Sequence, residues 1–115
     1  MTQLQVQTLS NQELNLALSV MMGYTIDKKR PGRFLSGNIS SMPSSYCTDP
    51  AASLEVQAKA IEVDHEDYLL KLMDVVYGGY VAVSSERITG LFTATPRQRA
   101  EAAYMTLQSY QVDKQ

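Results

Sequence analysis

The sequence feature that most constrains the fold is a set of three helix starts, each marked by a capping residue. Ser10 is followed three positions later by Glu13, the capping-box pattern in which each side chain accepts a hydrogen bond from the other residue's backbone amide. Asp49-Pro50 and Thr95-Pro96 place a capping side chain before a proline, which suits the first helical position because its missing N–H needs no partner there. The sequence therefore predicts helices over about 11–22, from 50 to about 62, and from 96 to about 110.

Apolar residues recur at helical spacing in these segments, which assigns one side of each helix to a core. The residues expected to face the core are Leu14, Ala17, Leu18, Met21 and Met22 in the first helix, Ala51, Leu54, Ala58 and Ile61 in the second, and Ala100, Ala103, Tyr104 and Leu107 in the third. Gly23 suits the left-handed position that follows the end of the first helix.

Two apolar runs between the second and third helices predict strands. Residues 68–77 and 80–84 are separated by Gly78-Gly79, and both glycines can take the positive φ that a two-residue hairpin turn requires. A helix is the alternative for residues 67–73, but the hairpin turn that follows them favours a strand. After a turn over 86–90, residues 91–94 are expected to form a third strand. The predicted fold class is α+β, with a short antiparallel sheet of about three strands packed with three helices in an α-β-α sandwich-like arrangement.

The length of 115 residues predicts a single domain over 1–115, with frayed ends at 1–7 and 111–115. Residues 24–47 contain Pro31, Gly32, Gly37, Pro43 and many serines without a sustained period. We expect a long loop there, with a short extended piece at 33–35. Loops of this length are uncommon in small domains unless they are functional or mobile, which favours a binding role for this one.

Charge and cysteine content limit the classes of partner and compartment. The formal net charge of -2 gives no overall attraction to extended nucleic acid or to an anionic membrane, and no apolar run approaches the ~20 residues of a membrane span. Cys47 is the only cysteine, so no intramolecular disulfide can form, and the polar first residues lack the apolar core of a signal peptide. We expect a cytoplasmic protein.

No pattern for catalysis or metal binding stands out. Cys47 and His65 lie in different segments, so we expect a buried thiol and a solvated histidine rather than a catalytic pair. The run Asp64-His65-Glu66-Asp67 lacks the ligand spacing of a calcium or zinc site and is expected to be a solvated acidic turn. The sequence predicts a non-enzymatic protein without metal or cofactor.

Basic residues mark the candidate binding site. Four of the ten lysines and arginines are clustered inside the long loop, within the six positions 28–33. Two more follow the start of the third helix, where free backbone amides attract anions. The predicted anion ligands are Lys28, Lys29, Arg30 and Arg33 of the loop, and Arg97 and Arg99 of the helix. The alternative interpretation is that both groups are only solvated.

Three stretches carry a resemblance to a known family. They are the Leu9-Ser10-Asn11-Gln12-Glu13-Leu14-Asn15 opening of the first helix, the segment Tyr46-Cys47-Thr48-Asp49-Pro50-Ala51-Ala52, and Ala94-Thr95-Pro96 with the alanines that follow. Together they resemble the phage ABA sandwich domain, a group of small phage and prophage proteins that are mostly of unknown function. The resemblance implies a phage accessory protein acting in the cytoplasm of a bacterial host.

Two hypotheses about function follow. In the first, the loop and the third helix converge on a phosphate-bearing molecule, and the protein sequesters a nucleotide signal of a bacterial defence system. In the second, the chain is an interaction module that binds and modulates a host or phage protein. Either is compatible with a homo-oligomer, because a short sheet has edges to protect.

Overall fold

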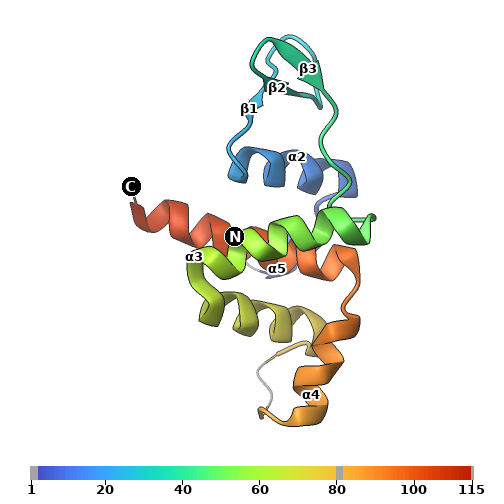
Figure 1. The fold of residues 1–115 in the computed structure, drawn as a ribbon, viewed down its shortest axis with the longest axis vertical. Coiled ribbons are helices and arrows are strands. Elements are labelled where there is room, and N and C mark those ends of the chain that lie inside the picture. Colours follow the sequence, from blue (N-terminus) through green and yellow to red (C-terminus); the bar gives the residue numbers. More distant parts are fainter. Residues whose placement is uncertain (1–2, 80–81, 115) are drawn as a thin grey trace.

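The computed structural model describes residues 3–79 and 82–114, which form an elongated molecule with extents of 48 × 31 × 24 Å. Its elements in chain order are α1 (Gln3–Gln7), α2 (Asn11–Met21), β1 (Thr25–Ile26), β2 (Phe34–Ser36), β3 (Ile39–Ser41), α3 (Pro50–Tyr77), α4 (Ser85–Gly90), the 3-10 helix η1 (Leu91–Thr93) and α5 (Pro96–Lys114). Figure 1 shows the sheet at one end of the long axis, α4 at the other, and the longer helices between them. The predicted α+β class with a three-stranded antiparallel sheet is confirmed.

The three helix starts lie where the capping residues predict them. The Ser10 hydroxyl accepts from the Glu13 amide at 3.0 Å, and the Glu13 carboxylate accepts from the Ser10 amide at 2.9 Å. Asp49 caps α3 by accepting from the Ala51 amide, and Pro50 is the first residue of that helix. Thr95 and Gln98 exchange the same pair of hydrogen bonds ahead of α5. Gly23 follows α2 with a φ of +104°, as expected.

The segment predicted to be the first strand is helical. Residues 68–77 form the second half of α3, which turns at Asp64, a residue with extended backbone angles inside the helix. The Asp64 carboxylate accepts from the Asp67 amide at 3.1 Å, so it caps the second half as an N-terminal capping residue does. Gly78 has the positive φ that the sequence indicates, but it ends this helix by donating to the Asp74 carbonyl at 2.8 Å. The expected hairpin is wrong because a left-handed glycine suits both a hairpin turn and a helix end.

The strand expected at 91–94 is also wrong, and the described part of the one expected at 80–84 is not a strand. Part of the segment 80–84 lies outside the described residues; Ala82–Ser84 are not in a strand, and Ser84 caps α4. Residues 91–93 form η1, and the predicted turn at 86–90 is the body of α4.

The sheet lies instead inside the predicted long loop. β1 pairs with β2 and β2 with β3, all antiparallel, and the two residues Gly37 and Asn38 join β2 to β3. Gly37 has a φ of +62°, which a tight hairpin turn demands. The extended piece expected at 33–35 overlaps β2. The sheet rests on α2, and the ring of Tyr24 packs on Phe34 with centroids 4.5 Å apart.

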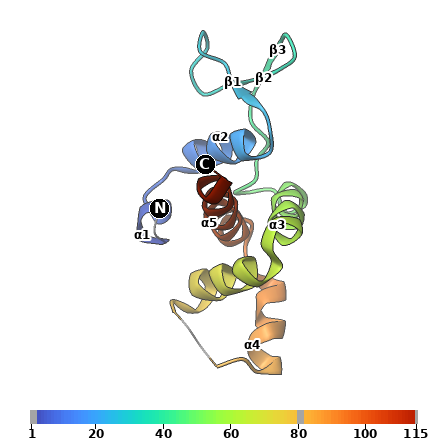
Figure 2. The same cartoon turned by 90° about the vertical axis from the view of Figure 1, so that its left-hand side faces the viewer.

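The core is built around α5. Residues 100–107 are all buried, including the predicted Ala100, Ala103, Tyr104 and Leu107. α3 packs along α5, and Figure 2 shows α5 end-on between α2, α1 and α3. At the two ends of the chain, α1 buries Val6 in the core and α5 continues to Lys114; fraying of 1–7 and 111–115 stays a prediction.

The core-facing side of α3 is not the one predicted. Ala52, Ser53, Val56 and Ala60 are buried, whereas Ala51, Leu54, Ala58 and Ile61 are exposed. Small side chains let two helices approach closely, so the alanine-rich side of α3 meets the alanine-rich α5. Leu54 and Ile61, in the first half of α3, are therefore left facing solvent.

Candidate functional site

The predicted basic loop is organised by one buried carboxylate. Asp27 is 5% exposed; its carboxylate accepts from the Ser40 hydroxyl at 2.6 Å and from the Lys29 amide at 3.0 Å. The Arg33 guanidinium donates to both the hydroxyl and the carbonyl of Ser40, at 2.9 and 3.0 Å. The Ser40 hydrogen bond, with help from the Lys29 amide and the Arg30 charge, lowers the pKa of Asp27 below its usual value. Arg33 therefore ties β2 to β3.

The remaining three basic residues of the loop surround an open hollow. Lys28, Lys29 and Arg30 line it together with strand residues and Asn38, in a volume of about 470 Å³. All three side chains are exposed, and Arg30 reaches Asp27 only at 3.9 Å. An anion could bind here by charge attraction, although the carboxylate of Asp27 beside it offsets part of that charge.

Arg97, in the first turn of α5, holds the N-terminal segment against that helix through several hydrogen bonds. Its guanidinium donates to the carbonyls of Val6 and Leu9 at 3.1 and 2.7 Å, and to the Asn11 side chain at 2.9 Å. Nε donates to the carboxylate of Glu101 at 2.6 Å, and Glu101 is 6% exposed. Nε and both terminal nitrogens of Arg97 therefore already donate hydrogen bonds within the protein, which argues against a role in binding an anion.

The two predicted halves of the anion site do not meet. Lys28, Lys29 and Arg30 lie on the sheet at one end of the molecule, whereas α5 begins beside η1 and α4 (Figure 1). Arg97 contacts α1 and the start of α2, and Arg99 faces a groove formed by α3, α4 and η1. A single ligand of nucleotide size would not bridge the loop and the α5 residues.

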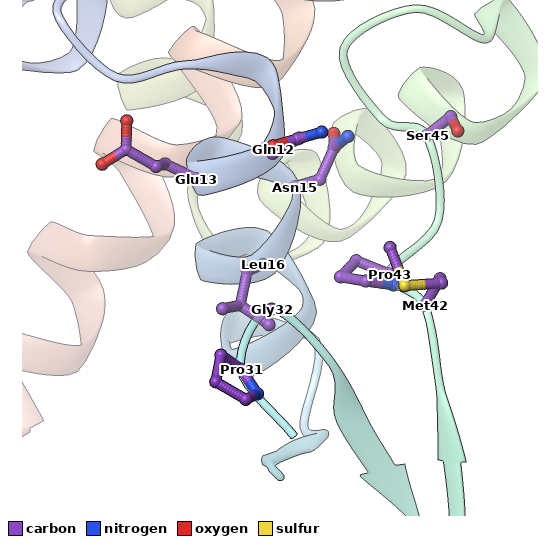
Figure 3. Close-up of a pocket in the computed structure, with 9 residues that line it drawn as sticks. All are labelled: Gln12, Glu13, Asn15, Leu16, Pro31, Gly32, Met42, Pro43 and Ser45. Atoms are coloured by element: carbon purple, nitrogen blue, oxygen red, sulfur yellow. The ribbon is translucent and has the colours of Figure 1, made fainter. Parts of the chain in front are cut away.

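A second hollow lies between α2 and the sheet. Its volume is about 530 Å³. Figure 3 shows Gln12, Asn15 and Leu16 of α2 facing Pro31 of the β1–β2 loop and Pro43 of the segment after β3. The lining is mainly apolar and amide side chains, with the Glu13 carboxylate and the Ser45 hydroxyl, and it contains no cation. It separates the sheet from the helical body, and nothing in its chemistry selects a ligand.

A third hollow, here called the elbow groove, is lined mainly by large apolar side chains. It lies where the two halves of α3 meet α4, η1 and the start of α5, and its volume is about 420 Å³. The turn at Asp64 makes the surface concave, because it directs both halves of α3 around one space. The lining residues are Leu54, Gln57, Ile61, His65, Tyr68, Leu69, Leu72, Ile88, Leu91, Phe92 and Arg99.

Large apolar side chains in the elbow groove are open to solvent. Phe92 is 74% exposed, Leu54 48% and Ile61 44%, and Leu69 and Ile88 are also exposed. Contiguous apolar surface of this kind on a small protein marks a site of interaction, whereas single exposed apolar residues need no explanation. Two of these residues, Leu54 and Ile61, are ones that the apolar spacing of the second predicted helix assigned to the core.

Polar groups in the elbow groove are few. The Tyr68 hydroxyl donates to the Gln57 side chain at 2.8 Å; burial raises its pKa, with the Arg99 charge opposing the rise, so it stays protonated. Arg99 donates to the Ser53 hydroxyl at 3.2 Å. His65 is exposed, as predicted, but it stands at the edge of the groove on α3 rather than in a turn.

No catalytic constellation is visible in the described residues. Cys47 is buried, as predicted, beside Arg97 and the Asn11 carbonyl, and burial raises the pKa of its thiol despite the Arg97 charge. A thiol with a raised pKa is a poor nucleophile near neutral pH. Across residues 3–79 and 82–114, no three His, Cys, Asp or Glu side chains gather in a way that could hold a metal ion. No helix in the same residues is long and apolar enough to cross a bilayer.

Compared with protein-family models, with curated proteins and with solved structures, the chain finds no match. The resemblance to the phage ABA sandwich domain therefore stays a prediction from short motifs.

Sequence reasoning missed the elbow groove because it placed Leu54 and Ile61 inside. A signal was present: the first half of α3 has one apolar side with Ala52, Val56 and Ala60 and a second with Ala51, Leu54, Ala58 and Ile61. Only one of these sides can pack on α5, so the pattern indicates that the second apolar side would have to be buried against another surface.

Proposed function

We propose that this chain acts as a non-catalytic interaction module whose elbow groove binds a segment of another protein. The observation that carries the proposal is the exposure of five large apolar side chains, Leu54, Ile61, Leu69, Ile88 and Phe92, around one concave surface. Burying an apolar side chain is worth about 1.5–3 kcal/mol, so covering this set supplies a substantial driving force for association.

The rim of the groove favours a protein over a small molecule. Phe92 stands at this rim with about three-quarters of its surface in solvent. A small ligand that filled the hollow would leave much of the Phe92 ring exposed to solvent, whereas a protein partner would bury both the hollow and its rim. Exposed aromatic side chains next to a pocket are typical of the residues that dominate binding energy at interfaces.

The resemblance to phage accessory proteins supports a host or phage protein as the partner. A second copy of this chain is the other apolar surface that could cover the groove, as the expected homo-oligomer would require. Size-exclusion chromatography with light scattering distinguishes these two partners. A monomer would leave the groove free to bind a different protein. A dimer that dissociates in the Ile61→Glu variant would show that the groove is a self-association interface instead.

A capture experiment tests the proposal. Tagged wild-type protein, Ile61→Glu and Ile39→Glu would be incubated with bacterial host lysate, and bound proteins quantified by mass spectrometry. Ile39 is 70% exposed on the sheet, so the second variant adds the same charge to an apolar position outside the groove. We expect a partner that Ile61→Glu loses by about tenfold or more and Ile39→Glu retains. Equal capture by all three proteins would count against the groove.

A second candidate function rests on the basic hollow. Lys28, Lys29 and Arg30 line one open space, which supports binding of a phosphate-bearing ligand such as a nucleotide, and through the phage resemblance its sequestration from a host defence system. Calorimetry with pyrophosphate and with linear and cyclic nucleotides tests this candidate. Binding should weaken in Lys28→Ala/Lys29→Ala and not in Lys59→Ala on α3. The candidate is dropped if no nucleotide binds or if the loop variant binds as well as wild type.

A further inference from the structure

The elbow groove contains a positive charge that forms no ion pair with any of the residues that the structure describes. Arg99 lines the groove from the first turns of α5, and its hydrogen bond to the Ser53 hydroxyl at 3.2 Å occupies one of its five donors. The ion pairs of the described residues join Arg30 to Asp27, Lys71 to Asp67 and Arg97 to Glu101, and none of them includes Arg99.

The contrast with Arg97 shows what Arg99 lacks. Two positions earlier on the same helix, Arg97 binds a carboxylate at 2.6 Å and two backbone carbonyls. Arg99 is partly buried between apolar walls, with one neutral hydroxyl as its partner. The nearby Tyr68 hydroxyl already donates to Gln57 and carries no charge.

We infer that Arg99 selects the partner: the segment that docks in the elbow groove carries an aspartate or glutamate whose carboxylate accepts hydrogen bonds from the Arg99 guanidinium. This inference rests on the proposed function and names the chemistry of the segment. Large apolar residues flank the acidic one and pack on Leu54, Ile61 and Phe92. A guanidinium presents two parallel N–H donors to a carboxylate, and apolar surroundings strengthen that pair relative to water.

Charge selection also limits which segments can bind. A basic residue opposite Arg99 would place like charges together in a dry groove, which costs several kcal/mol and excludes the segment. An apolar residue there would exclude water from the guanidinium and leave its charge without a counter-charge, which is also unfavourable. The groove therefore accepts apolar segments that bear a carboxylate and rejects those that do not.

The test uses a displayed library of random peptides of about 16 residues, long enough for a helix of about 24 Å. Peptides are selected on wild-type protein, and those that also bind Ile61→Glu are removed, so that the remaining pool depends on the groove. The same selection is run on Arg99→Gln. We expect an acidic residue at one position among apolar ones in the wild-type pool and no such enrichment in the Arg99→Gln pool.

A double-mutant cycle on one selected peptide then measures the pair. Replacing its acidic residue by the matching amide should weaken binding to wild type about tenfold, the effect of one charged hydrogen bond, and change binding to Arg99→Gln less than about twofold. Arg99→Lys should bind with intermediate affinity, because it keeps the positive charge but lacks the two parallel N–H donors of the guanidinium. Arg87→Gln is the matched control, since Arg87 lies over the Tyr77 ring outside the groove.

The outcomes separate the two ideas. Groove-dependent peptides without a carboxylate, or with equal affinity for wild type and Arg99→Gln, would overturn charge selection and leave the docking groove standing. Failure to recover any peptide that Ile61→Glu loses would overturn the docking groove, and charge selection with it. Thermal melting of each variant confirms that the fold is retained.

Discussion

Replacing Arg97 with alanine removes the guanidinium that holds the N-terminal segment to α5. The change removes the guanidinium hydrogen bonds to the carbonyls of Val6 and Leu9 and leaves Glu101, 6% exposed, without its counter-charge. Removing one partner of a buried ion pair costs about 3–5 kcal/mol. The Arg97 side chain is 23% exposed, which admits some water, so we expect the lower end, about 3 kcal/mol.

Urea unfolding followed by circular dichroism measures this loss. With a slope of about 1.5 kcal/mol per molar, a loss of about 3 kcal/mol lowers the midpoint by about 2 M. Arg97→Lys should lose less, because an ammonium still faces Glu101 but cannot reach both carbonyls. The double variant Arg97→Ala/Glu101→Gln should lose less free energy of unfolding than the sum of the two single variants, because it no longer buries an unpaired carboxylate.

Two results would refute this account of Arg97. One is a loss below about 1 kcal/mol for Arg97→Ala, within the usual effect of a surface substitution. The other is strict additivity in the double variant, which would show that Arg97 and Glu101 do not interact. Arg30→Ala is the control; its side chain is 66% exposed and its substitution should change stability by less than about 0.5 kcal/mol.

Three further predictions test the fold around the sites. Asp64→Ala should destabilise by about 1 kcal/mol in urea unfolding, because the second half of α3 loses its cap; unchanged stability would contradict that role. Gly90→Ala should cost about 1–3 kcal/mol, because its new methyl meets the Tyr77 hydroxyl, and the cost should shrink in a Tyr77→Phe background. The lowered pKa of Asp27 means that its charged form stabilises the folded loop above about pH 3.9, and that this contribution is lost as pH falls through the lower folded pKa. The Lys29 amide shift in NMR should report that midpoint, and a midpoint at or above the ordinary aspartate value would oppose the prediction.

Much of the local structure could be predicted because it depends on neighbours in sequence. The capping pair Ser10 and Glu13, and the cap-proline pairs at 49–50 and 95–96, form within one helical turn, so no distant residue is needed to place them. The position of Gly78 at the end of an element was also readable, but its positive φ does not say whether a strand or a helix ends there. That ambiguity turned the second half of α3 into an expected strand.

The sheet was missed because its strands are two or three residues long and carry little pattern. Gly37 and Asn38 were the available signal, since a two-residue turn with positive φ between short apolar runs favours a hairpin. The capping role of Asp64 was hidden in the same way, because four polar residues in a row are also typical of a loop.

For the candidate sites, the sequence by itself determined which residues carry charge and which are apolar, together with the starts of the helices that present them. Tertiary structure alone decided their partners. It satisfied Arg97 with backbone carbonyls and Glu101, left Arg99 two positions later with a single hydroxyl, and turned Leu54 and Ile61 toward solvent. The physical reason is that a helix has several sides, and close packing of small residues on α5 decides which side of α3 is buried. The remaining side of the first half of α3, with Leu54 and Ile61, became one wall of the elbow groove.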